Sequence, residues 1–200
     1  GLGGFSKKVL DGRRTLTPMV SKGVSERTIP SLLLKLPEGK RRQSSTVSSP
    51  VFEWQRFNQI AHELPPLFQE HWRELALNQD LIPLAPDFDR YYAYDIQGIL
   101  RVLTVRVEGR LVGYCFLLFG PHLHYVTTPW GHGEMFWLDP LYRQGWTGVK
   151  LFKELVRGCE GMGAKMLTVP IKLHFMNGRV IKLLERLGFK QIEVVMARRI

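Results

Sequence analysis

The segment Tyr142–Lys150, which reads YRQGWTGVK, has residue types suited to holding a phosphate group. Gly145 and Gly148 let the backbone approach a ligand closely, and Arg143 adds a positive charge. The segment joins a β-rich run to an amphipathic helix, whose first N–H groups are unpaired and lie at the positive end of the helix dipole. We therefore predict an anion site at this helix start.

Three histidines that precede this segment could move protons. His122 and His124 alternate by two, so they share one side of a strand, and His132 lies across a turn. These imidazoles could form a metal site, a proton relay or hydrogen-bonded packing. Because no carboxylate or thiol completes a familiar ligand spacing, we expect no metal.

These residues need a scaffold, and the hydrophobic pattern predicts a mixed one. Apolar residues at three- and four-residue spacing predict helices that start at Phe52 and at Pro65–Pro66, a short helix within 81–98, and helices at 149–157 and 177–187. β-rich runs predict a hairpin around Glu108–Arg110 and strands at 133–138, 165–172 and 190–198. This order of elements indicates an α/β (α+β) fold with helices on both faces of one sheet.

The distribution of charge divides the chain into two parts, 1–50 and 51–200. Residues 1–50 hold ten Lys and Arg against three acids, a net +7, and the other 150 residues hold 18 against 15, a net +3. The first part is rich in Ser, Thr, Gly and Pro and has one aromatic residue, Phe5, so it cannot build a core alone. We predict an extended, basic, low-complexity arm. It is either a solvated linker or a strap that docks on a protein partner or assembly, or nonspecifically on nucleic acid.

The composition also bears on the compartment. Cys115 and Cys159 are too few for a disulfide scaffold or a zinc cage, which favours a reducing environment. The longest apolar stretch, 111–120, has about half of the ~20 residues that a membrane-spanning helix needs. The first residues lack the pattern of a secretory signal. We therefore expect no membrane span and a cytoplasmic location.

Several stretches of the second part resemble the GNAT superfamily of acyl-CoA-dependent N-acyltransferases, over about residues 67–200. Residues 108–113 (EGRLVG) resemble its second and third strands, and residues 136–143 (FWLDPLYR) resemble its fourth strand entering the pyrophosphate loop. The most specific match is 177–189 (NGRVIKLLERLGF), which resembles the C-terminal helix and the Gly-Phe turn. Residues 121–128 (PHLHYVTT), with the preceding QEHWRELALNQD, are similar to a subgroup common in tailed bacteriophages.

The resemblance implies a central mixed, mostly antiparallel sheet and acetyl-CoA as the cosubstrate. It implies that the strand at 134–138 splays from its neighbour at 166–171, where Pro170 cannot donate a ladder hydrogen bond. Free backbone groups near Trp137 and Leu138 would then pair with the pantetheine arm. The other cofactor-binding residues that we expect are Arg143, Gln144, Gly145, Trp146, Thr147, Gly148 and Asn177. The catalytic candidates are Glu134 as the base, with His132 and Tyr142 as further proton-transfer groups.

Two positions depart from the superfamily pattern. Trp146 stands where the loop has its first glycine, and a left-handed conformation there would cost ~1–2 kcal/mol. Gly145, one place earlier, could compensate for it. Leu184 stands where many members have a tyrosine that protonates the leaving thiolate.

The resemblance favours an enzyme, an N-acetyltransferase that transfers an acetyl group from acetyl-CoA to an amine by direct attack, in the cytoplasm of a bacterial host cell. The acceptor stays open among a protein lysine or N-terminus, a small polyamine-like amine and a modified nucleobase. The alternative is a catalytically degenerate structural protein with the same fold. Its N-terminal arm would anchor it in a larger assembly such as a bacteriophage virion.

Overall fold

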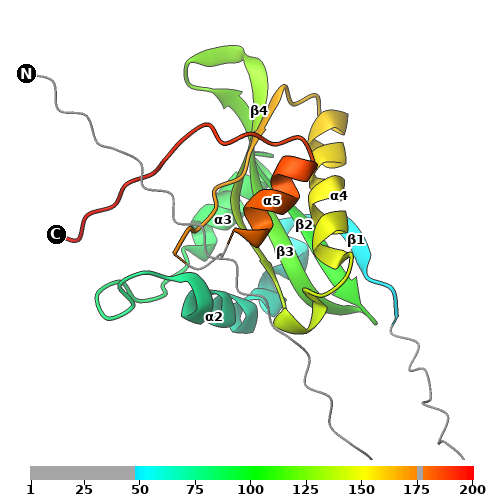
Figure 1. Ribbon diagram of the computed structural model, residues 1–200, viewed down its shortest axis with the longest axis vertical. Helices are drawn as coiled ribbons and strands as arrows, with labels where there is room; N and C mark the ends of the chain where they lie inside the picture. The colour runs from blue at the N-terminus through cyan, green and yellow to red at the C-terminus, as the bar shows by residue number, and fades with distance from the viewer. Residues whose placement is uncertain (1–47, 175–177) are drawn as a thin grey trace, which may run out of the picture. The chain divides into compact units, whose positions relative to one another are not determined.

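A computed structural model describes residues 48–174 and 178–200 of the chain (Figure 1). Nearly all of the predicted arm, residues 1–50, lies outside the described residues, as does Asn177. None of the helices in the described part is long and apolar enough to cross a bilayer.

A five-stranded sheet forms the centre of the domain, with the strands in chain order β1-β2-β3-β4-β5. Its strands are β1 (Val51–Gln55), β2 (Leu100–Val107), β3 (Arg110–His122), β4 (Tyr125–Leu138) and β5 (Met166–Thr168). The first four strands are antiparallel neighbours, and β5 pairs with β4 in parallel. The predicted mixed, mostly antiparallel sheet is confirmed.

Helices cover both faces of this sheet, as the order of elements predicts (Figure 1). One face packs against α1 (Phe57–Ile60), α2 (Leu64–Leu75) and α3 (Phe88–Ile96), and the other packs against α4 (Thr147–Gly161) and α5 (Arg179–Arg186). There are also two short 3-10 helices: η1 (Ala61–Glu63) joins α1 to α2, and η2 (Pro140–Tyr142) lies between β4 and α4.

Alternation along β3 contributes side chains to a separate apolar core on each face of the sheet. On β3, Tyr114 and Phe116 are fully buried against α1, α2 and α3, while Cys115 and Leu117 are fully buried against α4. Successive side chains of a strand point to opposite faces, so one apolar strand serves both cores. The run from Leu111 to Gly120 is therefore a central strand.

The structure moves the start of the helix predicted from Phe52 to Phe57, where α1 begins. Residues 51–55 form edge strand β1, in which Phe52 pairs with Val105 and Trp54 pairs with Leu103. Helical spacing is equally compatible with alternation over so few residues, and the ladder along β2 decides between them. The helix that was expected at Pro65 and Pro66 begins at Leu64, with proline in its first positions.

The C-terminal segment also differs from the prediction. Residues 190–198 are described but are not a strand, and Ile192, Val194 and Met196 are exposed. The strand that was predicted at 165–172 is only three residues long in β5. Because a strand needs a partner ladder, this short edge of the described sheet offers the C-terminal segment little to pair with.

Candidate functional site

A β-bulge interrupts β4 at Glu134. Phe116 of β3 pairs with Met135 and Leu117 pairs with Gly133, so Glu134 is an extra residue without a pairing partner on β3. Bulges redirect a side chain and are enriched beside active sites. The predicted base therefore stands at the one irregular position in the middle of the long β3–β4 ladder.

β4 and β5 pair only over a short distance and then separate. Their ladder joins Trp130, Gly131 and His132 to Met166, Leu167 and Thr168, whereas β4 continues to Leu138. Among the described residues, the β5-facing edge of β4 has no ladder partner after His132. This geometry confirms the predicted splay, and it leaves backbone groups near Trp137 available to an amide-bearing ligand.

The loop that follows β4 has an open backbone at the start of α4. Gly145 has φ +76°, whereas Trp146 has φ −100° and is 73% exposed. A Cβ atom built on Gly145 or Gly148 would meet nothing within 4 Å. The left-handed residue of the loop is thus Gly145. Trp146 has a negative φ, so its place at the position of the family glycine causes no backbone strain.

The N-terminus of α4 is also free of competing groups. This fully described helix has no acidic side chain in its first turn, and no side chain caps it at Trp146. Its first N–H groups therefore remain available at the positive end of the dipole. The start of a 15-residue helix beside two small, open residues fits the pyrophosphate of a coenzyme.

Arg143, which was predicted to contact the coenzyme, is bonded to groups of the protein itself. Both of its terminal nitrogens donate to the Glu74 carboxylate of α2, one of them over 2.6 Å to Oε2. Its Nε donates to the Leu138 carbonyl over 2.6 Å. The guanidinium therefore ties the loop to α2 and to the end of β4, and one backbone acceptor that was expected to bind pantetheine is already occupied.

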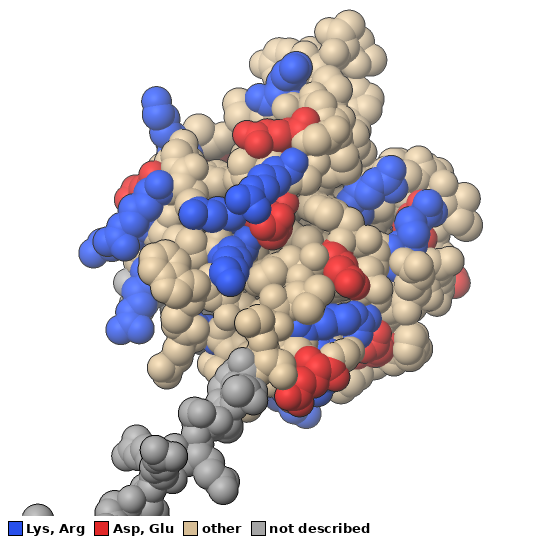
Figure 2. Space-filling model, turned by 90° about the vertical axis from the view of Figure 1, so that its right-hand side faces the viewer, with Lys and Arg blue, Asp and Glu red and all other residues tan. Residues whose placement is uncertain are grey.

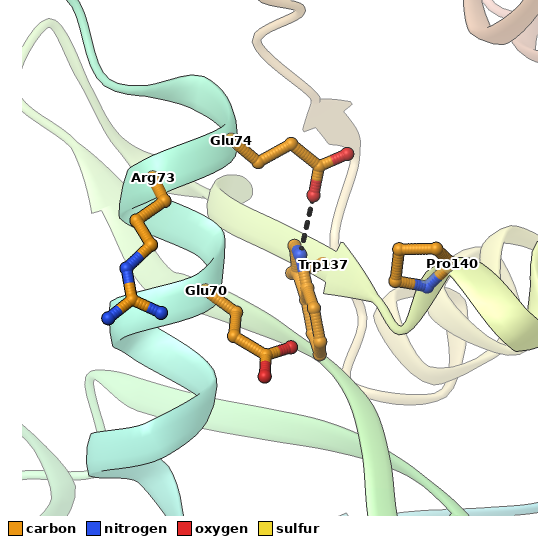
Figure 3. A pocket seen from close by; sticks show the side chains of 5 residues that line it. All are labelled: Glu70, Arg73, Glu74, Trp137 and Pro140. Atoms are coloured by element: carbon orange, nitrogen blue, oxygen red, sulfur yellow. Dashed lines mark hydrogen bonds between the residues drawn. The ribbon is translucent and has the colours of Figure 1, made fainter.

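Glu74 is the centre of this contact. The indole Nε1 of Trp137 donates to Glu74 Oε2 over 2.8 Å, and Figure 3 shows both side chains at a shallow pocket with Glu70, Arg73 and Pro140. Burial raises the pKa of Glu74, but the hydrogen bonds from Arg143 and Trp137 outweigh it and hold that pKa below its ordinary value. Glu74 is thus a charged carboxylate beside the loop.

His132 lies between Glu134 and β5. Its Nδ1 shares a 2.8 Å hydrogen bond with Thr168 Oγ1, and its Nε2 lies 3.8 Å from Glu134 Oε2. Both side chains are about half exposed. Burial, with contributions from Glu134 and Asp87, raises the pKa of Tyr91 on α3. The structure brings His132 and Glu134 together, and the charge of Glu134 contributes to the raised pKa of Tyr91.

Tyr142 is not part of this group. It lies on η2, where Arg110 Nη2 is 3.3 Å from its hydroxyl oxygen and 3.4 Å from Asp139 Oδ2. Leu184 of α5 is buried against α4 and the sheet, so it belongs to the core.

Glu74 and Tyr91 are neighbours of the site that sequence reasoning missed. Both belong to helices that the sequence predicted. Their partners, Arg143 and Glu134, are 69 and 43 positions further along the chain. No local pattern joins residues at such distances, although a carboxylate so close to the apolar positions of α2 is a weak signal of a buried partner.

Positive charge gathers in the part of the chain that follows the loop. Residues 147–190 hold nine Lys and Arg against three Glu, a net +6, whereas residues 48–146 hold seven Arg against eleven acids, a net −4. Lys153 and Arg157 line a depression between α4 and α5. Figure 2 shows Lys and Arg side chains spread over much of its face, with Asp and Glu side chains between them. The net positive charge of residues 147–190 favours an anionic ligand at this part of the chain.

The splayed strands, the bulge and the open helix start together match the features expected of a GNAT-like fold. The sequence pattern of the Acetyltransferase (GNAT) family matches residues 57–189, and the chain belongs to this family. No curated protein sequence matches the chain.

Several solved structures share the fold at low sequence identity. A ribosomal-protein-alanine N-acetyltransferase from Brucella melitensis biovar Abortus 2308 is 17% identical, with a TM-score of 0.57 over 76% of this chain and 99% of that one. AAC(6')-Iy in complex with a CoA-containing bisubstrate analog is 21% identical, with a TM-score of 0.51 over 76% and 98%. A predicted acetyltransferase with acetyl-CoA from Clostridium acetobutylicum is 9% identical, with a TM-score of 0.55 over 76% and 96%.

Proposed function

We propose that the chain is an N-acetyltransferase that transfers the acetyl group of acetyl-CoA to an amine by direct attack. The observation that supports this most is the open start of α4, with Gly145 and Gly148 beside the strand separation and the Glu134 bulge. Structures of the same fold carry acetyl-CoA or a CoA-containing analog. Acetyl-CoA supplies a thioester, whose carbonyl carbon an amine can attack.

Each part of the site has a distinct task in this proposal. The N–H groups at the start of α4 bind the pyrophosphate, and the free edge of β4 near Trp137 hydrogen-bonds the pantetheine amides. Glu134 accepts a proton from the acceptor ammonium, which frees the lone pair for attack. His132, between Glu134 and Thr168, orients this carboxylate and relays the proton. Leu184 is buried and apolar, so α5 supplies no acid at that position for the departing thiolate.

Two measurements test this proposal. Thermal unfolding of the full chain should shift up by roughly 5 to 10 °C at acetyl-CoA concentrations of about 100 times Kd, which corresponds to ~2.7 kcal/mol. Acetyl transfer to an amine should fall by about 100-fold in Glu134→Gln, because general bases contribute ~10²–10⁴-fold. Glu160→Gln, an exposed change on α4, is the matched control. Turnover that is equal in the two variants would remove Glu134 from its role.

A second candidate is a structural protein that reuses the fold, and the ion pair between Arg143 and Glu74 favours it. A guanidinium engaged by a carboxylate does not meet a phosphate, and Leu184 does not supply an acid. In this alternative the basic N-terminal arm anchors the domain in an assembly such as a phage particle, as the phage-like segments of the sequence suggest. The absence of any thermal shift at millimolar acetyl-CoA, with co-purification of the full chain in such particles, would favour this candidate.

A further inference from the structure

Three aromatic side chains cluster near the tip of the β3–β4 hairpin. We name His122, Tyr125 and Trp130 the tip cluster. Their ring centroids are 4.5 to 6.0 Å apart, and the ring planes differ by 30° at most. Tyr125 is 55% exposed, so the cluster offers aromatic surface to a ligand. The hairpin that carries it projects beyond the helices in Figure 1.

The tip cluster and Glu134 lie along the same side of β4. A Cβ atom on Gly131 would contact Cys159 and Leu117, which places Gly131 on the α4 side. Trp130 and His132 are its two neighbours along the strand, so they point to the opposite face. His132 lies 3.8 Å from Glu134 through their side chains. A continuous row of Trp130, His132 and Glu134 therefore leads from the tip cluster to the proposed base.

The electrostatics of this row favour a cation. Residues 111–142, which include all of β4, contain no Lys or Arg and two acids, Glu134 and Asp139. The faces of Trp and Tyr rings attract ammonium groups, because the ring quadrupole is negative there. The row itself therefore carries no cationic side chain of Lys or Arg and favours a ligand with ammonium groups, although Lys165 borders it where its backbone N–H donates to the Pro129 carbonyl.

We propose that the tip cluster is a second-ammonium subsite, and that the acceptor is a linear diamine or polyamine. This inference rests on the proposed acetyltransferase function and names its substrate class. One terminal amine lies at Glu134 and loses its proton there. The other ammonium group lies on the exposed faces of Tyr125 and Trp130, so that the carbon chain runs along β4 past His132.

The strand sets the length of this acceptor. Trp130 and Glu134 are four positions apart, which is about 13 Å at the rise of a β-strand. An extended chain covers about 3.5 Å for every three bonds, so about eleven bonds separate the two nitrogens. Diamines with about nine to eleven carbons, or a polyamine of that span, fit this distance. A four-carbon diamine is too short to reach both ends.

The test is a series of α,ω-diamines from four to twelve carbons, with the monoamine of equal length as the control, assayed for acetyl transfer by the full chain. We expect kcat/KM to peak near ten carbons and to exceed that of the matching monoamine about fivefold, as a cation–π contact at a partly exposed site gives. Trp130→Leu should abolish this preference, and Trp130→Phe should restore part of it. Trp54→Leu changes an exposed tryptophan of β1, at the opposite edge of the sheet, and should keep the preference.

Calorimetric titration of the same diamines into the protein without acetyl-CoA tests the second-ammonium subsite independently of the proposed acetyltransferase activity. Length-dependent binding that Trp130→Leu weakens supports the subsite even where no amine is acetylated. Acetylation of all amines without dependence on length or on the second ammonium overturns the subsite and leaves the acetyltransferase standing. Equal diamine preference in Trp130→Leu and Trp54→Leu also overturns it.

Discussion

Gly148 allows the coenzyme site to be closed without weakening the fold. Gly148 is the second residue of α4, has no positive φ, and has open space where a Cβ would lie. Gly148→Leu therefore introduces neither backbone strain nor a clash at Cβ. Its side chain fills the space in which the proposed pyrophosphate approaches the first N–H groups of the helix.

The two effects of this change have opposite signs. Leucine favours a helix over glycine by up to ~0.8 kcal/mol, so the free energy of unfolding without ligand should stay equal or rise, with a Tm increase of up to about 3 °C. The stabilisation by acetyl-CoA should vanish, which at 100 times the wild-type Kd removes ~2.7 kcal/mol. Gly161→Leu, at the other end of α4 and equally open at Cβ, is the matched control.

Thermal unfolding of the wild type and both variants, with and without acetyl-CoA, measures both effects. We expect the ligand-induced shift in the wild type and in Gly161→Leu, but not in Gly148→Leu. A full shift in Gly148→Leu would refute the placement of the pyrophosphate at the start of α4. A large loss of stability without ligand in Gly148→Leu would refute our description of that space as open.

Three further predictions concern the framework of the site. Glu74→Gln should lower the free energy of unfolding by about 1–3 kcal/mol, because it leaves the Arg143 guanidinium without its carboxylate; chemical denaturation measures this change. Burial lowers the pKa of His71 from 6.5 to about 4, so that on acidification the imidazole binds a proton in the unfolded chain before it does so in the folded one. The free energy of unfolding should therefore fall by up to about 3 kcal/mol from pH 6.5 to pH 4. Chemical denaturation at each pH measures this change. Gly158→Ala should cost ~1–3 kcal/mol in the same assay, because its Cβ would overlap the indole ring of Trp54.

Each of these predictions has a control on the same element. Glu70→Gln, one turn before Glu74 on α2 and exposed, should be neutral. His71→Asn keeps a polar partner for the Tyr114 hydroxyl and should flatten the pH dependence between pH 4 and 6.5, and an unchanged slope would assign that slope to other groups. Gly161→Ala should not destabilise α4, and Trp54→Ala should relieve the cost of Gly158→Ala. A Gly158→Ala penalty that persists without the indole would contradict the steric explanation.

The elements that the sequence predicted well are those that local chemistry specifies. The hairpin turn at Glu108 and Gly109 has two positive φ values, +51° and +79°, which suit a two-residue turn with glycine in second place. The helix at 149–157 and the loop glycines were recognised for similar reasons. In each case the residues that specify the element lie within about ten positions of one another, so the element can be predicted without knowledge of how the domain packs.

The features that were missed depend on pairing between distant residues. The spacing predicts a helix where β1 forms because five residues do not define a period, and the β2 partners of β1 are about 50 positions away. The ion pair of Arg143 was not foreseen, because its carboxylate partner, Glu74, lies on α2, 69 positions away. The separation of β4 from β5 was expected only through the family resemblance. Spacing within one segment does not reveal which charged groups meet.

The bulge at Glu134 shifts the phase of β4 by one residue. Before it, the even-numbered Trp130 and His132 face the side of α1, α2 and α3, and after it the odd-numbered Met135 and Trp137 face that side. Deleting Glu134 would remove the extra residue, so that Met135 would follow Gly133 in regular alternation. The indole that holds Glu74 would stay on its side of the sheet, and Phe136, which packs edge-on against Phe152 of α4, would stay on the other. A substitution at this position should alter chemistry alone, and a deletion should remove the bulge while keeping the residues of both cores on their own faces.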